Sequence, residues 1–307
     1  MVRRHLFGVV VGLSLLAGAA RAGDGAGIIA FGDSLSDMGN RWLDTKKPDI
    51  KFRRTWVAQL AEPAMLDCKG FKPSGISSFY GGTNYAVGGA GTAATANMGL
   101  ARNRGQDLTQ QVSKRYLNPE FNKAGVQAGA LHVIVIGSND VVAASAEPVQ
   151  ILTGWEGLNA MAVAVAQSTE GQIDALAKAG VKRVMWGNVF DVSRAPALRT
   201  RAKTLLPEAV APNYLAAVAK AVRAHNAEMD AAIGRLSKAH PGLEVVKLDL
   251  FGRFEEMSAD PVKFGLADVT TGANDDKHLF SADGLHPTPK GHKLIAEFAF
   301  EVVKKGK

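Results

Sequence analysis

A serine and a histidine–aspartate pair are the residues of this chain whose types and spacing could do nucleophilic chemistry. Ser34 follows the apolar run 28–31 and lies within the polar, turn-forming segment 32–40. Such apolar runs are typical of buried parallel strands, and open α/β sheets bind ligands just beyond the carboxyl ends of their strands. Near the other end of the chain, Asp283 precedes His286 by three residues. This spacing lets the carboxylate hold the imidazole tautomer while the second ring nitrogen faces the serine.

Two further segments could stabilise the negative charge that a serine attack creates on a carbonyl oxygen. Asn139 follows the apolar run 131–136, and its amide can donate to a developing oxyanion, although asparagines in turns usually bond their own backbone. The segment 84–92 is a short predicted strand that runs into glycines, which let a ligand approach the main chain. Each segment is ambiguous alone, since Ser34 by itself is typical of a helix N-cap.

The order of these segments along the chain resembles the conserved blocks of the GDSL, or SGNH, hydrolases. The matching blocks are residues 31–40 (Phe-Gly-Asp-Ser-Leu-Ser-Asp-Met-Gly-Asn), 84–90, 137–140 and 283–288. The resemblance extends over about residues 28 to 300, which is nearly the whole chain beyond its N-terminal segment. One departure is Ala282, where many relatives carry an aromatic residue.

The resemblance implies a serine hydrolase in which Ser34 is the nucleophile, His286 is the general base and Asp283 orients the imidazole. It also implies an oxyanion hole formed by the backbone amides of Ser34 and Gly89 and by the side chain of Asn139. Gly89 is implied rather than the preceding glycine, because the functional glycine of the family stands five positions after the asparagine of its block. This chemistry requires neither a metal nor a cofactor.

Three aspartates near these blocks also look chemical, but a structural role is favoured for each. Asp33 and Asp37 flank the serine at the start of a predicted helix, where a carboxylate can accept free amide hydrogens. Asp140 follows Asn139 in the same kind of position. We therefore expect these carboxylates to be part of the scaffold and not acid–base catalysts.

Three alternative functions remain open beside ester hydrolysis. The same acyl-enzyme could transfer its acyl group to an alcohol instead of water, and the same scaffold could serve as a binding protein without catalysis. A metal site could be built from the segment 274–278 with Asp283, His286 and His292. The spacing of that cluster matches no regular zinc or calcium loop, and a metal site would leave the serine, glycine and asparagine blocks unexplained.

The remaining patterns predict alternating strands and helices. The runs 181–187 and 243–248 have the apolar, β-branched content of strands, whereas three segments carry apolar residues at helical spacing, namely 159–179, 214–237 and 290–304. We expect a three-layer α/β/α fold with a mostly parallel, flavodoxin-like sheet of the SGNH-hydrolase type. Long irregular segments are predicted near 41–80, 92–128, 188–212 and 250–281. Their aromatic residues, Phe190 and Phe254 among them, either line an acyl-chain groove or pack the loops down.

The N-terminus predicts export from the cell that makes the protein. Arg3 and Arg4 precede the apolar stretch 6–20, which ends at small residues. This stretch is too short for an ordinary membrane span, and no second long apolar stretch follows it. We therefore expect residues 1–22 to be a cleaved bacterial signal peptide. Residues 23–307 would then be one hydrolase domain that is periplasmic or secreted and has no integral membrane segment.

Charge and cysteine content limit the partners of the chain. Lys and Arg number 36 against 29 Asp and Glu. Without the three arginines of the leader the formal charge falls to +4, and the basic residues are scattered, which favours a solvated surface over nucleic-acid binding. Cys68 is the single cysteine, so no intramolecular disulfide can form. We expect a monomer whose partner is a small-molecule, lipid or carbohydrate ester.

Overall fold

A parallel sheet lies at the centre of the computed structural model, which describes residues 27–41, 54–74, 81–95 and 106–305. Within these residues, four strands form the sheet in the order β1-β2-β3-β4, and each neighbouring pair is parallel. The strands are β1 (Ile28–Gly32), β2 (Leu131–Val135), β3 (Arg183–Gly187) and β4 (Glu244–Leu248). All four were predicted from their apolar runs, with boundaries that differ by one or two residues.

The segment 83–87 occupies the place of a fifth strand beside β1. Tyr85 donates its N–H to the carbonyl of Ala30 at 2.7 Å, and Val87 donates to the carbonyl of Gly32 at 2.9 Å. The segment was predicted as a strand, but it forms an isolated bridge between Ala30 and Asn84 and no continuous ladder. With this segment included, the sheet has the flavodoxin-like order 2-1-3-4-5, and the order in which successive strands are added reverses between β1 and β2, although all strands stay parallel. Sheets of this kind bind ligands at that reversal, beyond the carboxyl ends of the strands.

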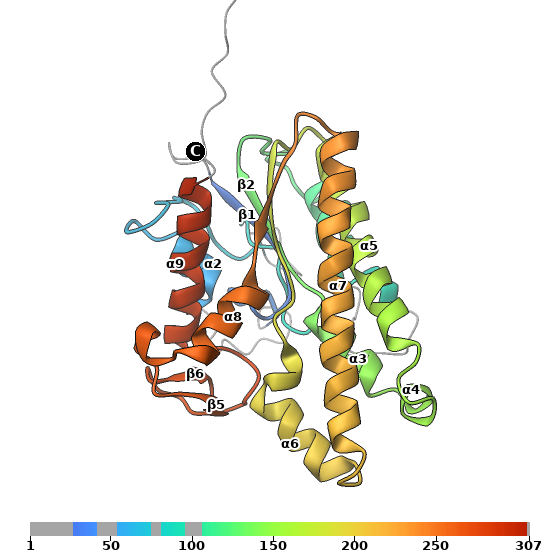
Figure 1. Ribbon diagram of the computed structural model, residues 1–307. Coiled ribbons are helices and arrows are strands. Elements are labelled where there is room, and N and C mark those ends of the chain that lie inside the picture. The colour runs from blue at the N-terminus through green and yellow to red at the C-terminus, as the bar shows by residue number, and fades with distance from the viewer. Residues whose placement is uncertain (1–26, 42–53, 75–80, 96–105, 306–307) are drawn as a thin grey trace, which may run out of the picture.

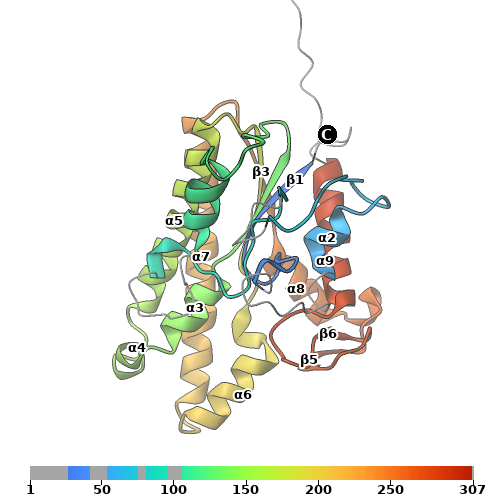
Figure 2. The same ribbon diagram turned by 180° about the vertical axis from the view of Figure 1, so that it is seen from behind.

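Helices cover both faces of the sheet (Figures 1 and 2). On one face α5 (Leu158–Lys178) packs along α7 (Ala211–Ala239). On the other face α9 (Pro289–Lys305) packs against α2 (Trp56–Leu60) and α8 (Leu250–Ala259). These three layers confirm the predicted α/β/α architecture.

Alternation along the strands explains why both faces need cover. Ile29 and Phe31 of β1 are fully buried in a cluster that includes Met229 of α7. Ile28 and Ala30 point to the opposite face and join a cluster that includes Ile295 of α9. A strand that is buried on both faces has no polar alternation, so it reads as the continuous apolar run seen in the sequence.

All four segments expected to be irregular contain helices, with α2 in segment 41–80 and the π-helix Gln110–Tyr116 in segment 92–128. Segment 188–212 holds α6 (Pro196–Leu205), and segment 250–281 holds α8. Helix α6 begins with a proline in its first turn and buries Leu198 and Ala202, which are four residues apart. The buried stripe is narrow and the helix also exposes the apolar Leu205, so the helical period is weak in the sequence.

Shorter elements complete the described chain. They are η2 (Ala93–Thr95), the π-helix η3 (Gln110–Tyr116), α3 (Ser138–Ser145), α4 (Pro148–Leu152), η4 (Val192–Arg194), η5 (Val262–Phe264), β5 (Asp268–Gly272) and β6 (His278–Phe280). Strands β5 and β6 form a small second sheet. This sheet and α6 lie at the end of the molecule toward which the main strands run (Figure 1).

The predicted signal peptide, residues 1–22, lies outside the described residues. Among the helices that the structure describes, none has both the length and the apolar composition needed to cross a membrane. Cys68 is buried and is not part of a disulfide. Its burial, together with the charge of the neighbouring Asp67, raises the pKa of the thiol to about 11.

Candidate active site

Three side chains from distant parts of the sequence form a hydrogen-bonded chain at the carboxyl edge of the sheet. Ser34 follows β1, whereas Asp283 and His286 lie in the loop between β6 and α9. His286 Nε2 is 2.7 Å from Ser34 Oγ, and His286 Nδ1 is 2.6 Å from Asp283 Oδ2. With the proton on Nδ1, the imidazole donates to the carboxylate and its Nε2 can accept the serine proton.

Asp283 is held as an ionised acceptor by its own turn. Its Oδ1 accepts the backbone N–H groups of Leu285 at 2.8 Å and His286 at 2.9 Å, and the hydroxyl of Ser281 at 2.9 Å. Partial burial raises the pKa of this carboxyl, but the hydrogen bonds from His286 and Leu285 outweigh burial and hold the pKa well below its ordinary value. The carboxylate is therefore charged wherever a histidine base would work.

The loop that carries Asp283 and His286 is anchored to both α6 and β6. Gly284 adopts a left-handed conformation (φ +68°), and its carbonyl accepts the N–H of Ala197 in the first turn of α6 at 3.0 Å. A Cβ at this glycine would lie 2.9 Å from that nitrogen, so the contact requires glycine. On the other side, Thr288 Oγ1 donates to the carbonyl of His278 in β6 at 2.7 Å.

The turn that presents Ser34 begins with a backbone position that only glycine can occupy. Gly32 ends β1 at φ +133°, and a Cβ there would lie 2.0 Å from the carbonyl oxygen of Val135. Asp33 follows it, and its buried Oδ1 accepts the N–H of Leu35 at 3.0 Å. Burial raises the pKa of the Asp33 carboxyl to about 7.

Asp37 ties the nucleophile turn to the glycine block. Its buried carboxylate accepts four backbone N–H groups, those of Gly39, Asn40, Arg41 and Gly88. Burial raises the pKa of Asp37, and these bonds oppose that rise. In the third block, Asp140 accepts the N–H of Thr92 at 2.8 Å. These contacts agree with the structural role expected for the aspartates.

The three groups expected to donate to an oxyanion differ in the hydrogen bonds that they already make. Among the described residues, no acceptor takes the backbone N–H of Ser34 or of Gly89. The N–H of Gly88 already donates to Asp37 at 2.7 Å, which favours Gly89 as the donor of this block. Asn139 gives one amide hydrogen to the carbonyl of Ala90 at 2.9 Å, and the second hydrogen of its NH₂ group is left for a ligand.

Two residues that the sequence did not mark support this arrangement. Gln111 of η3 is fully buried, and its Oε1 accepts the N–H of Gly32 at 2.8 Å while its Nε2 donates to the carbonyl of Gly32 at 2.8 Å. It thereby replaces a neighbouring strand at the point where β1 ends. Arg41 Nη1 donates to the carbonyl of Gly88 at 2.9 Å and so braces the glycine turn. No local pattern marks either residue, because each partner is distant in the sequence.

The residues of the alternative metal site are spread over separate contacts. His278 faces Asp275 at 2.9 Å on the surface, whereas His292 is buried and its Nδ1 accepts the N–H of Trp56 at 3.2 Å. Burial, together with the charge of His286, lowers the pKa of His292 to about 3, so this ring is neutral. Within the described ranges, no group of three or more His, Cys, Asp or Glu side chains is arranged to hold a metal ion.

Comparison with known proteins agrees with the motif blocks. The family model described as GDSL-like Lipase/Acylhydrolase matches residues 28–299 of this chain. Among curated proteins, the chain is similar to "Lipase 1" of Photorhabdus luminescens, with 23% identity over 346 residues of alignment. That alignment covers 90% of this chain and 50% of the relative, so the chain spans about half the length of the protein it matches.

Proposed function

The chain belongs to the GDSL-like lipase/acylhydrolase family, and from this premise we propose that it is a secreted serine esterase or lipase. It hydrolyses carboxylic ester bonds through an acyl-enzyme on Ser34. Family membership supports ester hydrolysis in general. The serine mechanism is carried by one observation, the hydrogen-bonded chain from Ser34 Oγ through His286 to Asp283.

In the first half of the reaction, Ser34 Oγ attacks the ester carbonyl while His286 Nε2 takes the hydroxyl proton. The carbonyl π electrons move onto oxygen, and the N–H groups of Ser34, Gly89 and Asn139 donate to this oxyanion. The negative charge of Asp283 stabilises the imidazolium. When the tetrahedral intermediate collapses, the bond to the alcohol oxygen breaks and His286 gives its proton to that oxygen.

In the second half, water attacks the acyl-enzyme. His286 accepts one proton of this water, the same donors hold the second oxyanion, and the bond between the acyl carbon and Ser34 Oγ breaks. The proton returns from His286 to Ser34 and the carboxylic acid leaves. No step of this cycle calls for a group that the chain itself lacks.

The site of action is part of the proposal. We place the enzyme in the periplasm or outside a bacterial cell, with residues 1–22 as the signal peptide and residues 23–307 as one hydrolase domain. Support comes from the paired arginines and the short apolar stretch near the start of the sequence. N-terminal sequencing of the protein recovered from a culture tests this placement, and an intact Met1 on the exported protein would contradict it.

The mechanism is tested by substitution and labelling of Ser34. Ser34→Ala should abolish hydrolysis of p-nitrophenyl butyrate and should prevent labelling by a fluorophosphonate, because the attacking oxygen is gone. Ser36→Ala is the matched control, since Ser36 lies in the same turn and its Oγ accepts the indole N–H of Trp56 at 3.1 Å. The control should still be labelled. Full activity in Ser34→Ala would refute the assignment.

A further inference from the structure

A groove with a volume of about 680 Å³ opens beside the Asp283 end of the candidate active site. Helix α6 forms one wall, and the opposite wall consists of β5 together with the turn 282–284. Asp283 lines the groove directly. The mechanism described above uses no residue of the α6 wall.

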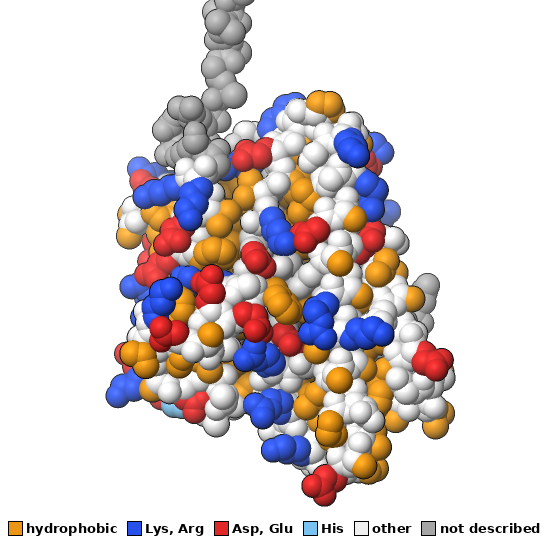
Figure 3. Space-filling model, in the orientation of Figure 1, with side chains coloured by type: hydrophobic (Ala, Val, Ile, Leu, Met, Phe, Trp, Pro, Cys, Tyr) orange, Lys and Arg blue, Asp and Glu red, His pale blue; other side chains and the backbone are white. Residues whose placement is uncertain are grey.

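The α6 wall carries positive charge that the protein does not neutralise. Arg199 and Lys203 are four residues apart, so they lie on the same side of the helix. Both side chains are exposed, and among the described residues neither forms an ion pair. Arg194, just before α6, differs because it pairs with Glu255. Basic side chains gather over α6 on this face of the molecule (Figure 3).

The two nearby carboxylates, those of Asp268 and Asp283, are charged, but within the described ranges they form no ion pair with Arg199 or Lys203. Thr270 and Thr271 give their hydroxyl hydrogens to Asp268, at 3.0 and 2.9 Å. The carboxylate of Asp268 is therefore already solvated by the protein, and that of Asp283 is occupied by His286 and its own turn. The groove thus presents two unpaired cations to anything that enters it.

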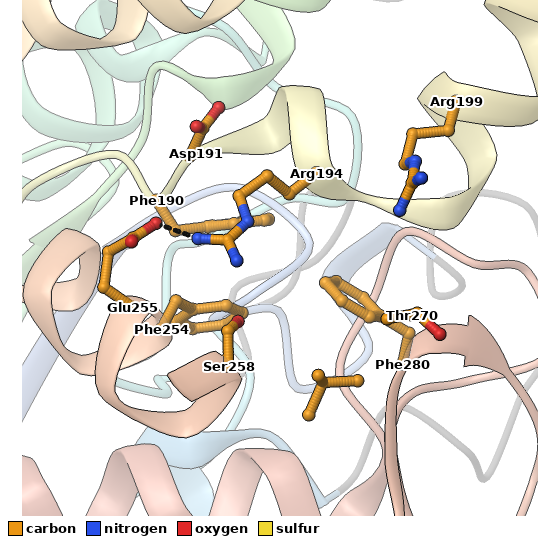
Figure 4. Close-up of a pocket in the computed structure, with 10 residues that line it drawn as sticks. Phe190, Asp191, Arg194, Arg199, Phe254, Glu255, Ser258, Thr270 and Phe280 are labelled. Carbon is orange, nitrogen blue, oxygen red and sulfur yellow. Dashed lines mark hydrogen bonds and ion pairs between the residues drawn. The ribbon is translucent and has the colours of Figure 1, made fainter. Parts of the chain in front are cut away.

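Arg199 stands where this groove meets a second, smaller hollow. The smaller pocket has a volume of about 100 Å³ and shares Arg199 and Thr270 with the groove. Its floor includes Phe254, which stacks on Phe190 with ring centroids 4.4 Å apart. In Figure 4, Arg199 reaches down from α6 in the direction of Thr270. Arg199 therefore lines both hollows at the place where they meet.

The reaction connects this groove to the substrate. His286 gives its proton to the oxygen of the leaving alcohol, so the alcohol moiety must lie on the histidine side of Ser34. The groove begins at Asp283, which holds that histidine, and α6 is joined to the same turn by the bond from Ala197 to Gly284. We propose that the groove binds the alcohol moiety of the ester, and that this alcohol bears a phosphate or carboxylate held by Arg199 and Lys203. This inference rests on the proposed esterase function.

The test compares two esters that share one short acyl chain, 1-acylglycerol 3-phosphate and uncharged 1-acylglycerol. We expect kcat/KM to be about tenfold or more higher for the phosphate ester, since a charge-assisted contact is worth about this factor. The ratio of the two kcat/KM values should fall as salt is added, because both cations are exposed. An acylglycerate, which bears a carboxylate, distinguishes between the two anions.

The double variant Arg199→Gln, Lys203→Gln should bring this ratio to about one, mainly through a higher KM for the phosphate ester. The ratio does not depend on how much of the variant is folded, because a loss of folded protein lowers both rates equally. Arg201→Gln is the matched control, since Arg201 is an exposed cation of the same helix that does not line the groove. This control should keep the ratio of the parent.

The outcomes distinguish a failure of the groove assignment from a failure of the proposed esterase function. If both esters are hydrolysed with a ratio near one, or if the double variant keeps the ratio of the parent, the groove assignment is wrong and the esterase function stands. If the parent hydrolyses neither ester nor p-nitrophenyl butyrate, the proposed function is wrong and the groove assignment falls with it.

Discussion

Replacing Asp33 by asparagine should raise the free energy of unfolding of the protein more at neutral and alkaline pH than at acid pH. The Asp33 side chain is 1% exposed and directly precedes Ser34. Burial raises the pKa of its carboxyl from the ordinary 3.8 to about 7, and the charges of Asp140 and Asp37 act in the same direction. The hydrogen bond from Leu35 and the charge of His286 oppose the rise. At a pH between these two values, the folded protein therefore holds a proton at Asp33 that the unfolded chain has released.

The direction of the pH effect follows from this difference. Between pH 3.8 and about 7, unfolding releases the Asp33 proton, so the free energy of unfolding falls as pH rises through this window. Below pH 3.8 the contribution of the Asp33 proton to the free energy of unfolding is fully present, and above about pH 7 this contribution is fully lost. A rise of about three pKa units corresponds to a loss of at most about 4 kcal/mol. Asparagine has no charge at any pH, and its Oδ1 can still accept the N–H of Leu35.

The assay is urea unfolding of the parent and Asp33→Asn between pH 4 and pH 9, followed by tryptophan fluorescence. The variant should gain stability relative to the parent as pH rises to about 7, by up to about 4 kcal/mol, and the gain should then stay level. Asp268→Asn is the control. Burial raises the pKa of Asp268, but hydrogen bonds from Thr270 and Thr271 outweigh burial and lower the pKa to about 2. The contribution of Asp268 is therefore constant over most of this range, and its loss should not vary with pH.

A difference in unfolding free energy between Asp33→Asn and the parent that does not change from pH 4 to pH 9 would refute this reasoning. It would mean that Asp33 ionises in the folded protein as an ordinary carboxyl does, so that water or an unrecognised donor compensates its burial. A difference that changes in the opposite direction would mean that the folded protein prefers the charged carboxylate at this position.

Three further predictions concern the site. Asp283→Asn should lower kcat by orders of magnitude with little change in KM, because an amide cannot stabilise the imidazolium; parental rates across the pH range would contradict this role. Gln111→Leu should lower the free energy of unfolding by about 1–3 kcal/mol in urea titrations, because the buried N–H of Gly32 loses its acceptor. An unchanged urea midpoint would show that this bond is replaced. EDTA should leave the hydrolysis rate unchanged, since His286 activates the nucleophile; a loss that one divalent ion restores would favour a metal mechanism.

The parts of the fold that could be predicted are the strands and helices whose burial produces an apolar run or a helical spacing of apolar residues in the sequence. Strands β1, β2 and β3 are rich in apolar residues, interrupted only by His132 in β2 and Arg183 at the start of β3, because both faces of the sheet are covered. Helices α5 and α7 are long enough for their apolar spacing to be evident. Helix α6 was missed because it is short and buries only Leu198 and Ala202. The segment 84–87 was predicted as a strand, and it forms an isolated bridge between Asn84 and Ala30 in place of a continuous ladder.

In the candidate site, residues that stand in short motifs could be predicted, whereas residues that act through a partner distant in the sequence could not. Ser34, Asp283 and His286 stand in short motifs whose order along the chain can be read, and their mutual contacts were expected on that basis. The contact of the Gln111 side chain with the backbone of Gly32 could not be predicted from the sequence. Its partner lies 79 residues away, and a glutamine within an amphipathic segment is ordinarily a solvated residue. Distant side-chain-to-backbone bonds of this kind have no signature in a single sequence.

The buried carboxyls next to Ser34 reduce the stability of the fold, and the site gives a reason to keep them. Burial raises the pKa of both Asp33 and Asp37, so each lowers the free energy of unfolding once it is charged. In return, Asp37 binds four backbone N–H groups and joins the nucleophile turn to Gly88. Donors that are fixed before the substrate arrives need no reorganisation when the oxyanion forms. Asp33→Asn should therefore be more stable than the parent at neutral pH. Any decrease in its rate of ester hydrolysis measures what the charge of Asp33 contributes to the geometry around Ser34.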